Sequence, residues 1–125
     1  MIRGIHHISM KCATKEDADK VKSFYGGVLG LKLFREWEGG FMLDTCSGLI
    51  EVFTTGQGES SKGVIRHVAL LTDDVDETAD RVRAAGYEIL IEPNNREFPS
   101  SPKYGFRMAF CRGPLGEEIE LFCQK

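Results

Sequence analysis

The chain has 125 residues, a formal net charge of -3 and 42% hydrophobic residues. Its length corresponds to one domain, and its 16 lysines and arginines are scattered, which excludes the concentrated positive surface of a nucleic-acid-binding protein. We find no apolar stretch of membrane-spanning length and no basic, then apolar N-terminal leader. We therefore expect a cytoplasmic protein with neither nucleic-acid nor membrane partners.

The first half of the chain predicts a strand, a helix and three further strands. Residues 5–12 alternate between polar and apolar side chains, as in a strand. Thr14 and Asp17 resemble a capping box, and apolar residues then recur every three or four positions until Gly30, which is typical of the residue after a helix. Three strand candidates follow near residues 32–37, 40–45 and 48–54.

The second half repeats this order. Residues 55–63 are small and polar, with three glycines, and predict a flexible linker. After a strand at 64–71, Asp74 and Glu77 form a second capping box, and the helix that follows ends at Gly86. Strands are predicted near residues 87–92, 105–112 and 117–123. We therefore predict one domain, residues 1–125, made of two βαβββ modules at 1–54 and 64–125.

The second module is longer because of residues 93–105, which contain three prolines. Such a segment is longer than a simple hairpin turn, and long loops on a rigid scaffold often cover a binding site. We expect a loop here and leave open whether it is a lid or a surface excursion.

The cysteines are widely spaced and contain no C-x-x-C pair. We expect them to be buried thiols in a reducing compartment rather than a disulfide framework. They are Cys12, Cys46, Cys111 and Cys123.

Two histidines and two glutamates occupy equivalent places in the two modules. One histidine opens each module and one glutamate lies in each closing strand; they are His7, Glu51, His67 and Glu120. If an approximate two-fold axis relates the modules, the four side chains converge. Two imidazoles and two carboxylates suit a divalent ion such as Ni, Co, Zn or Fe, with two positions left for water or substrate.

Each of these residues alone has a plainer explanation. A glutamate in an amphipathic strand is usually solvated, and a single histidine in a strand is usually a hydrogen-bonded structural residue. The repetition of the same order and flanks favours the metal site. His6 competes with His7 for this role, but aligning His-Ile-Ser-Met with His-Val-Ala-Leu selects His7.

Several phrases of the sequence resemble the vicinal oxygen chelate superfamily, which includes glyoxalase I, bleomycin-resistance proteins and extradiol dioxygenases. They are His7-Ile8-Ser9-Met10, Phe24-Tyr25, Val28-Leu29-Gly30-Leu31, Ile50-Glu51, His67-Val68-Ala69, Gly113-Pro114-Leu115-Gly116 and Ile119-Glu120-Leu121-Phe122. The resemblance implies an α+β fold in which two βαβββ modules form a curled mixed sheet around a metal.

The His, Glu, His, Glu set is most similar to bacterial glyoxalase I, which implies His7, Glu51, His67 and Glu120 as metal ligands. It also implies a lyase or isomerase that transfers a proton next to a carbonyl through a metal-bound enediolate. Glu120 is the first candidate for the base and Glu51 the second. The implied substrate is a small molecule such as a thiol adduct of a 2-oxoaldehyde, and we expect a homodimer because small curled sheets leave exposed edges.

Two other functions stay open. The protein could instead bind and sequester a small molecule without metal, as bleomycin-resistance proteins do, or be an epimerase that uses the same chemistry. The stretch Val52-Phe53-Thr54-Thr55 lacks the asparagine that helps bacterial glyoxalase I to hold glutathione, which leaves the thiol co-substrate open.

Overall fold

The structure is a computed structural model that describes residues 1, 5–54, 67–98 and 104–125. Contacts divide the chain into two compact units, Met1–Ser61 and Lys62–Lys125. The expected linker, residues 55–63, lies outside the described residues. In the part of the chain that is described, no helix is long and apolar enough to cross a membrane.

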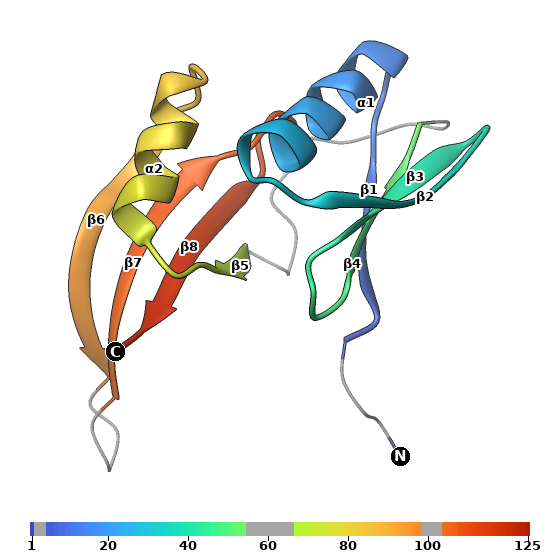
Figure 1. Cartoon of the computed structure of the whole chain (residues 1–125). Helices are drawn as coiled ribbons and strands as arrows, with labels where there is room; N and C mark the ends of the chain where they lie inside the picture. The colour runs from blue at the N-terminus through green and yellow to red at the C-terminus, as the bar shows by residue number, and fades with distance from the viewer. Residues whose placement is uncertain (2–4, 55–66, 99–103) are drawn as a thin grey trace. The chain divides into compact units, whose positions relative to one another are not determined.

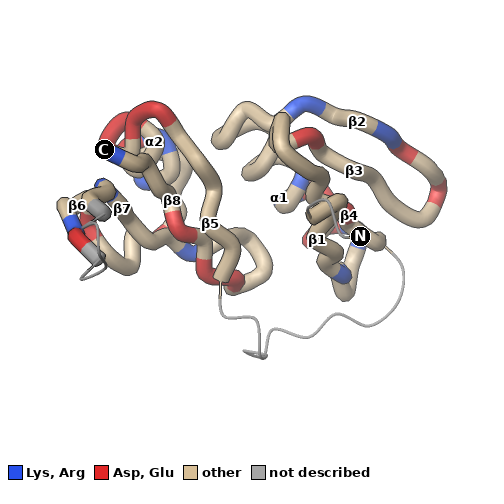
Figure 2. The backbone as a smooth tube through the Cα atoms, turned by 90° about the horizontal axis from the view of Figure 1, so that it is seen from below, with Lys and Arg blue, Asp and Glu red and all other residues tan. Residues whose placement is uncertain are grey.

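The first unit contains one four-stranded sheet and one helical segment (Figure 1). Its elements are β1 (His7–Lys11), α1 (Lys15–Lys22), the π-helix η1 (Ser23–Val28), β2 (Lys32–Trp37), β3 (Gly40–Asp44) and β4 (Leu49–Phe53). The strand order is β1-β4-β3-β2; β1 and β4 are parallel and the other neighbours antiparallel. The edge strand β2 carries two basic residues, Lys32 and Arg35, followed by the acidic Glu36 (Figure 2).

The second unit repeats this topology. Its elements are β5 (Val68–Leu71), α2 (Val75–Ala84), β6 (Ile89–Phe98), β7 (Tyr104–Arg112) and β8 (Glu118–Gln124). The order is β5-β8-β7-β6, again with a parallel first pair and antiparallel neighbours. Each unit is thus a βαβββ module, and the predicted α+β fold is confirmed.

Both helices begin at the capping residues that the sequence indicates. The Thr14 hydroxyl accepts a hydrogen bond from the Asp17 amide at 3.1 Å, and the Asp74 carboxylate accepts one from the Glu77 amide at 2.9 Å. These bonds satisfy amides that have no partner within the first helical turn. The start of each helix is therefore fixed by local sequence.

The first helical segment is not a uniform α-helix. From Ser23 its hydrogen bonds change from the α to the wider π pattern, as in the 3.0 Å bond from the Leu29 amide to the Phe24 carbonyl. A wider helix rotates less per residue, so it brings consecutive side chains closer to one face. Phe24 and Tyr25 are both buried there, with rings edge-on at 5.1 Å. The buried residues of the segment, Ala18, Val21, Phe24 and Tyr25, still follow the predicted spacing of three and four positions.

One face of each sheet forms the core of its unit. In β4, Ile50 and Val52 are buried while the residues between them are only partly covered. In β8, Ile119 and Leu121 are buried in the same alternating pattern. The other face of each sheet carries the histidine and glutamate of that module.

The prediction of a loop at residues 93–105 is wrong. Residues up to Phe98 belong to β6 and residues from Tyr104 belong to β7, and the two strands pair from Phe98 with Tyr104 to Ile89 with Cys111. Register shifts between Ile89 and Asn94 accommodate Pro93, whose missing amide would otherwise leave a gap in the ladder. Most of the segment is thus a long hairpin, and residues 99–103 lie outside the described part of the chain.

The cysteines are thiols, as predicted, but they are not all buried. Cys12 and Cys111 are fully buried, whereas Cys123 is half-buried. Cys46 is exposed in the turn between β3 and β4, with a positive φ of 68°. The amide of Cys46 donates a 2.7 Å hydrogen bond to the Asp44 carboxylate, which stabilises this turn geometry.

Candidate functional site

In the first unit, His7 and Glu51 lie on the same face of two adjacent parallel strands. The register pairs Ser9 of β1 with Glu51 of β4, so His7, two residues earlier, is the diagonal neighbour of Glu51. The Nε2 atom of His7 lies 3.6 Å from Oε1 of Glu51.

The second unit builds the same pair with the same offset. Here Ala69 of β5 pairs with Glu120 of β8, and His67 again precedes the paired residue by two positions. Its Nε2 atom lies 3.2 Å from Oε2 of Glu120. Each unit therefore brings together one predicted histidine and one predicted glutamate.

The two pairs also have the same solvent exposure. The imidazoles of His7 and His67 are 41% and 39% exposed, whereas the carboxylates of Glu51 and Glu120 are each 13% exposed. Among the described residues, each carboxylate has one ion-pair partner, the imidazole of its own unit. Each pair thus presents a largely covered carboxylate beside a partly exposed imidazole.

The donor atoms fit a first-row divalent ion. Metal–nitrogen and metal–oxygen bonds of about 2.1 Å place adjacent ligand atoms roughly 3.0 Å apart in an octahedron and roughly 3.4 Å apart in a tetrahedron. The observed nitrogen–oxygen distances of 3.6 and 3.2 Å require only small side-chain adjustments to meet these values. Among the described residues, no group of three or more histidine, cysteine, aspartate or glutamate side chains suits a metal. Within a unit, a pair therefore supplies two ligands at most.

The two imidazoles have different neighbours. His6 lies beside His7, with their Nδ1 atoms 3.0 Å apart and their ring planes perpendicular. The ring of His67 instead packs edge-on against Phe110, with centroids 5.1 Å apart. Of the two histidines, it is His7 whose Nε2 atom lies near the Glu51 carboxylate, and its role as a ligand stays a prediction.

Sequence reasoning missed Phe110 as part of this surface. Phe110 is the register partner of Glu120, and Met42 holds the same position opposite Glu51 in the first unit. The burial of Ala109 and Cys111 on either side of Phe110 agrees with this placement, and the sequence alone does not give the register that pairs Phe110 with Glu120.

Comparisons with known proteins agree with this architecture. A crystal structure of a glyoxalase/bleomycin resistance protein/dioxygenase from Alicyclobacillus acidocaldarius is 17% identical over 96% of this chain and 90% of its own, with a TM-score of 0.70. Lactoylglutathione lyase from Agrobacterium tumefaciens is 19% identical over 98% of this chain and 95% of its own, with a TM-score of 0.71. A virulence protein from Salmonella typhimurium is 18% identical over 98% of both chains, also with a TM-score of 0.71. At these identities the likeness demonstrates a shared fold.

A comparison of this sequence with curated proteins finds no significant match. The sequence model described as the Glyoxalase/Bleomycin resistance protein/Dioxygenase superfamily, however, matches residues 4–121, which is nearly the whole length. The chain therefore belongs to the glyoxalase/bleomycin resistance protein/dioxygenase superfamily.

Proposed function

We propose that this protein is a metal-dependent lyase or isomerase of the glyoxalase I kind. Its four metal ligands would be the imidazoles and carboxylates of His7, Glu51, His67 and Glu120. The observation that carries the proposal is the repeated His–Glu pair, with nitrogen–oxygen distances of 3.6 and 3.2 Å and the same strand offset in both units. A solvated or purely structural role for each residue would not require this repetition.

The proposed reaction moves a proton between two neighbouring carbons of a small carbonyl compound, such as a thiol adduct of a 2-oxoaldehyde. A bound Ni, Co, Zn or Fe ion would supply positive charge to stabilise negative charge that develops on two adjacent substrate oxygens. Glu120 is the proposed base that accepts the proton and returns it to the neighbouring carbon, with Glu51 as the second candidate. Both carboxylates are largely covered, which limits exchange of the carried proton with water.

Metal stoichiometry provides the first test. If all four residues hold one ion, the chain binds about one equivalent of Zn or Ni, and either Glu51→Gln or Glu120→Gln weakens that single site. If each pair binds its own ion, two equivalents bind and each variant loses only one. Glu77→Gln, an exposed residue of α2, is the matched control. Binding of no metal contradicts the proposal and favours a metal-free binding protein, whereas binding that both substitutions leave unchanged shows that the ion is held by other residues and contradicts the proposed ligands.

Turnover provides the second test. Methylglyoxal is assayed with several thiols and with Ni, Co and Zn, while solvent deuterium incorporation reports proton transfer. Replacing the base should lower kcat by roughly 10²- to 10⁴-fold, and comparing Glu120→Gln with Glu51→Gln at saturating metal assigns the role. Failure with every thiol and metal would overturn the glyoxalase I activity, and deuterium exchange without isomerisation of the aldehyde would favour an epimerase.

We also propose a homodimer. Among the described residues of the first unit, β2 is an edge strand of its sheet, and three of its large apolar residues are at least one-third exposed, Leu33, Phe34 and Trp37. Light scattering at several protein concentrations tests the assembly, and a monomer at all of them contradicts it.

A further inference from the structure

We propose that His6 is a positioning residue for His7. In the metal-loaded protein, the Nδ1 atom of His6 accepts a hydrogen bond from Nδ1–H of His7 and thereby aims Nε2 of His7 at the ion. This inference rests on the proposed metal site, and it assigns a role to a residue outside the ligand set.

The geometry of the first unit separates the two nitrogens of His7 into two tasks. Nδ1 lies 3.0 Å from Nδ1 of His6, which is a hydrogen-bond distance. Nε2 lies 3.6 Å from the Glu51 carboxylate. One side of the imidazole is therefore engaged by His6, while the other faces the carboxylate that would share the metal.

Metal binding decides the direction of this hydrogen bond. A neutral imidazole carries one proton, so a His7 ring that coordinates through Nε2 must be protonated at Nδ1. The Nδ1 atom of His6 must then be the acceptor, which places the His6 proton on its own Nε2. Ligating histidines usually donate their second nitrogen to such a partner, and this contact fixes both the tautomer and the ring orientation.

The second unit supplies an internal comparison. His67 follows an arginine in the sequence, and its ring is packed edge-on against Phe110 rather than against another imidazole. The two proposed imidazole ligands are therefore held in different ways. A substitution at His6 should affect the ligand in the first unit and leave the environment of His67 unchanged.

Three substitutions test this role in the full chain, with Zn as the probe. His6→Ala removes the acceptor; His6→Asn restores one near the position of Nδ1; His6→Gln places its amide near the position of Nε2 instead. We expect His6→Ala and His6→Gln to weaken Zn binding by roughly 10- to 100-fold, and His6→Asn to stay within a few-fold of the wild type. Because His6 is exposed, the free energy of unfolding of the metal-free protein should not change measurably.

Nitrogen-15 NMR of the Zn-loaded protein reports which ring nitrogen of His7 carries the proton. A purely structural role of His6 would not affect this. The wild type and His6→Asn should show His7 protonated at Nδ1 with a slowly exchanging proton; His6→Ala should lose that protection, and the His67 signals should not shift. Equal Zn affinity in the wild type and His6→Ala, or loss of affinity in His6→Asn, overturns this inference alone. If His7→Ala binds Zn as tightly as the wild type, both this inference and the proposed metal site are overturned.

Discussion

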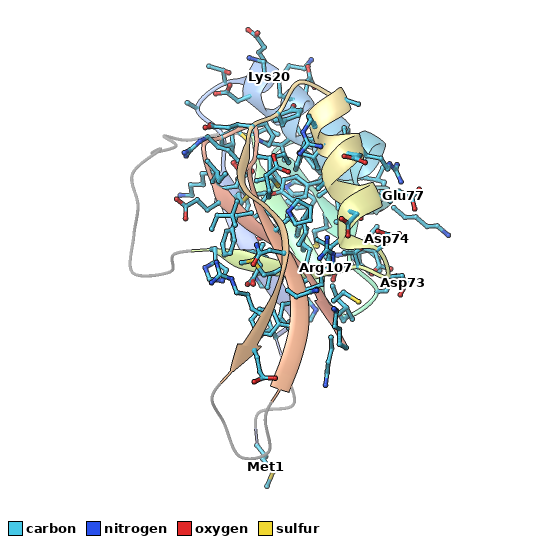
Figure 3. The ribbon with its side chains drawn as sticks, turned by 90° about the vertical axis from the view of Figure 1, so that its left-hand side faces the viewer. Met1, Lys20, Asp73, Asp74, Glu77 and Arg107 are labelled. Carbon is cyan, nitrogen blue, oxygen red and sulfur yellow. The ribbon has the colours of Figure 1, made fainter. Side chains whose placement is uncertain are left out.

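The guanidinium of Arg107 in β7 binds the carboxylate of Asp76 in the first turn of α2 through two hydrogen bonds. Nε lies 2.5 Å from Oδ2 and Nη2 lies 2.6 Å from Oδ1, while Nη1 also donates to the amide oxygen of Asn95 at 3.2 Å. Figure 3 shows Asp74 and Glu77 at the start of the helix and Arg107 on the neighbouring strand. This contact joins the helix to the sheet within the second unit.

The first prediction concerns acid stability. The hydrogen bond from Arg107 is the main cause that lowers the pKa of Asp76; desolvation opposes it in part, and the positive charge of Arg107 adds a further, smaller lowering. A carboxyl whose folded pKa is depressed stabilises the protein above its unfolded pKa of about 3.9, and this contribution is lost as the pH falls through the folded value. We expect Asp76→Asn to be less stable than the wild type at pH 7, with a difference that shrinks below pH 4.

Urea unfolding at pH 7 and at pH 3 measures the difference in unfolding free energy between Asp76→Asn and the wild type. Asp19→Asn is the control, because Asp19 is an exposed residue of α1. A stability difference for Asp76→Asn that stays constant from pH 7 to pH 3 would contradict the linkage.

The second prediction compares two leucines. Leu121 in β8 is 1% exposed, whereas Leu71 in β5 is 80% exposed. Leu121→Ala should cost about 2–5 kcal/mol of unfolding free energy because it leaves a cavity, and Leu71→Ala should change it by less than about 0.5 kcal/mol. Denaturant unfolding compares the two, and a large loss for Leu71→Ala would show that Leu71 is buried in an interface.

The third prediction concerns the capping residues. Thr14→Ala and Asp74→Ala each remove the side-chain acceptor for an amide in the first helical turn. Each should cost about 1 kcal/mol, whereas substitution by Ser should recover most of that loss. Unfolding curves of the four variants test this, and equal stability of the Ala and Ser variants would show that the cap bonds contribute nothing.

The fourth prediction concerns thiol reactivity. Burial raises the pKa of the Cys111 thiol to about 11, with a smaller contribution from the negative charge of Glu117, while Cys46 is exposed. Because the thiolate is the reactive form, a maleimide should modify Cys46 in the folded protein and reach Cys111 only after unfolding. Mass spectrometry after timed labelling measures both rates, with Cys46→Ser as the control. Comparable native rates for the two thiols would contradict the burial of Cys111.

The fifth prediction concerns metal removal. An ion that binds only the folded chain stabilises it by about 2.7 kcal/mol at a free concentration of 100 times Kd. Adding Ni or Zn should therefore raise the Tm, and a chelator should reverse the rise. The effect should be smaller in Glu51→Gln, whereas a Tm that rises equally in that variant would indicate binding elsewhere.

Local sequence determined the element order, both helix starts and the α+β class. Capping at Thr14 and Asp74 depends on amides within a single turn, and the glycines after the helices, Gly30 and Gly86, have positive φ values of 78° and 89°. Strand alternation also placed Glu51 on the face opposite the core. These features follow from interactions between residues close in sequence, so composition and periodicity suffice to predict them.

The sequence also selected the four proposed ligands by their repetition, and their joint binding of one ion remains a prediction. Tertiary structure decided the His–Glu pairing within each unit and the contact between His6 and His7. It also placed Phe110 opposite Glu120 and Met42 opposite Glu51. It also turned the expected loop into a long hairpin. A side chain's neighbours across a sheet are set by strand register, and hydrogen bonds between segments far apart in the chain fix that register.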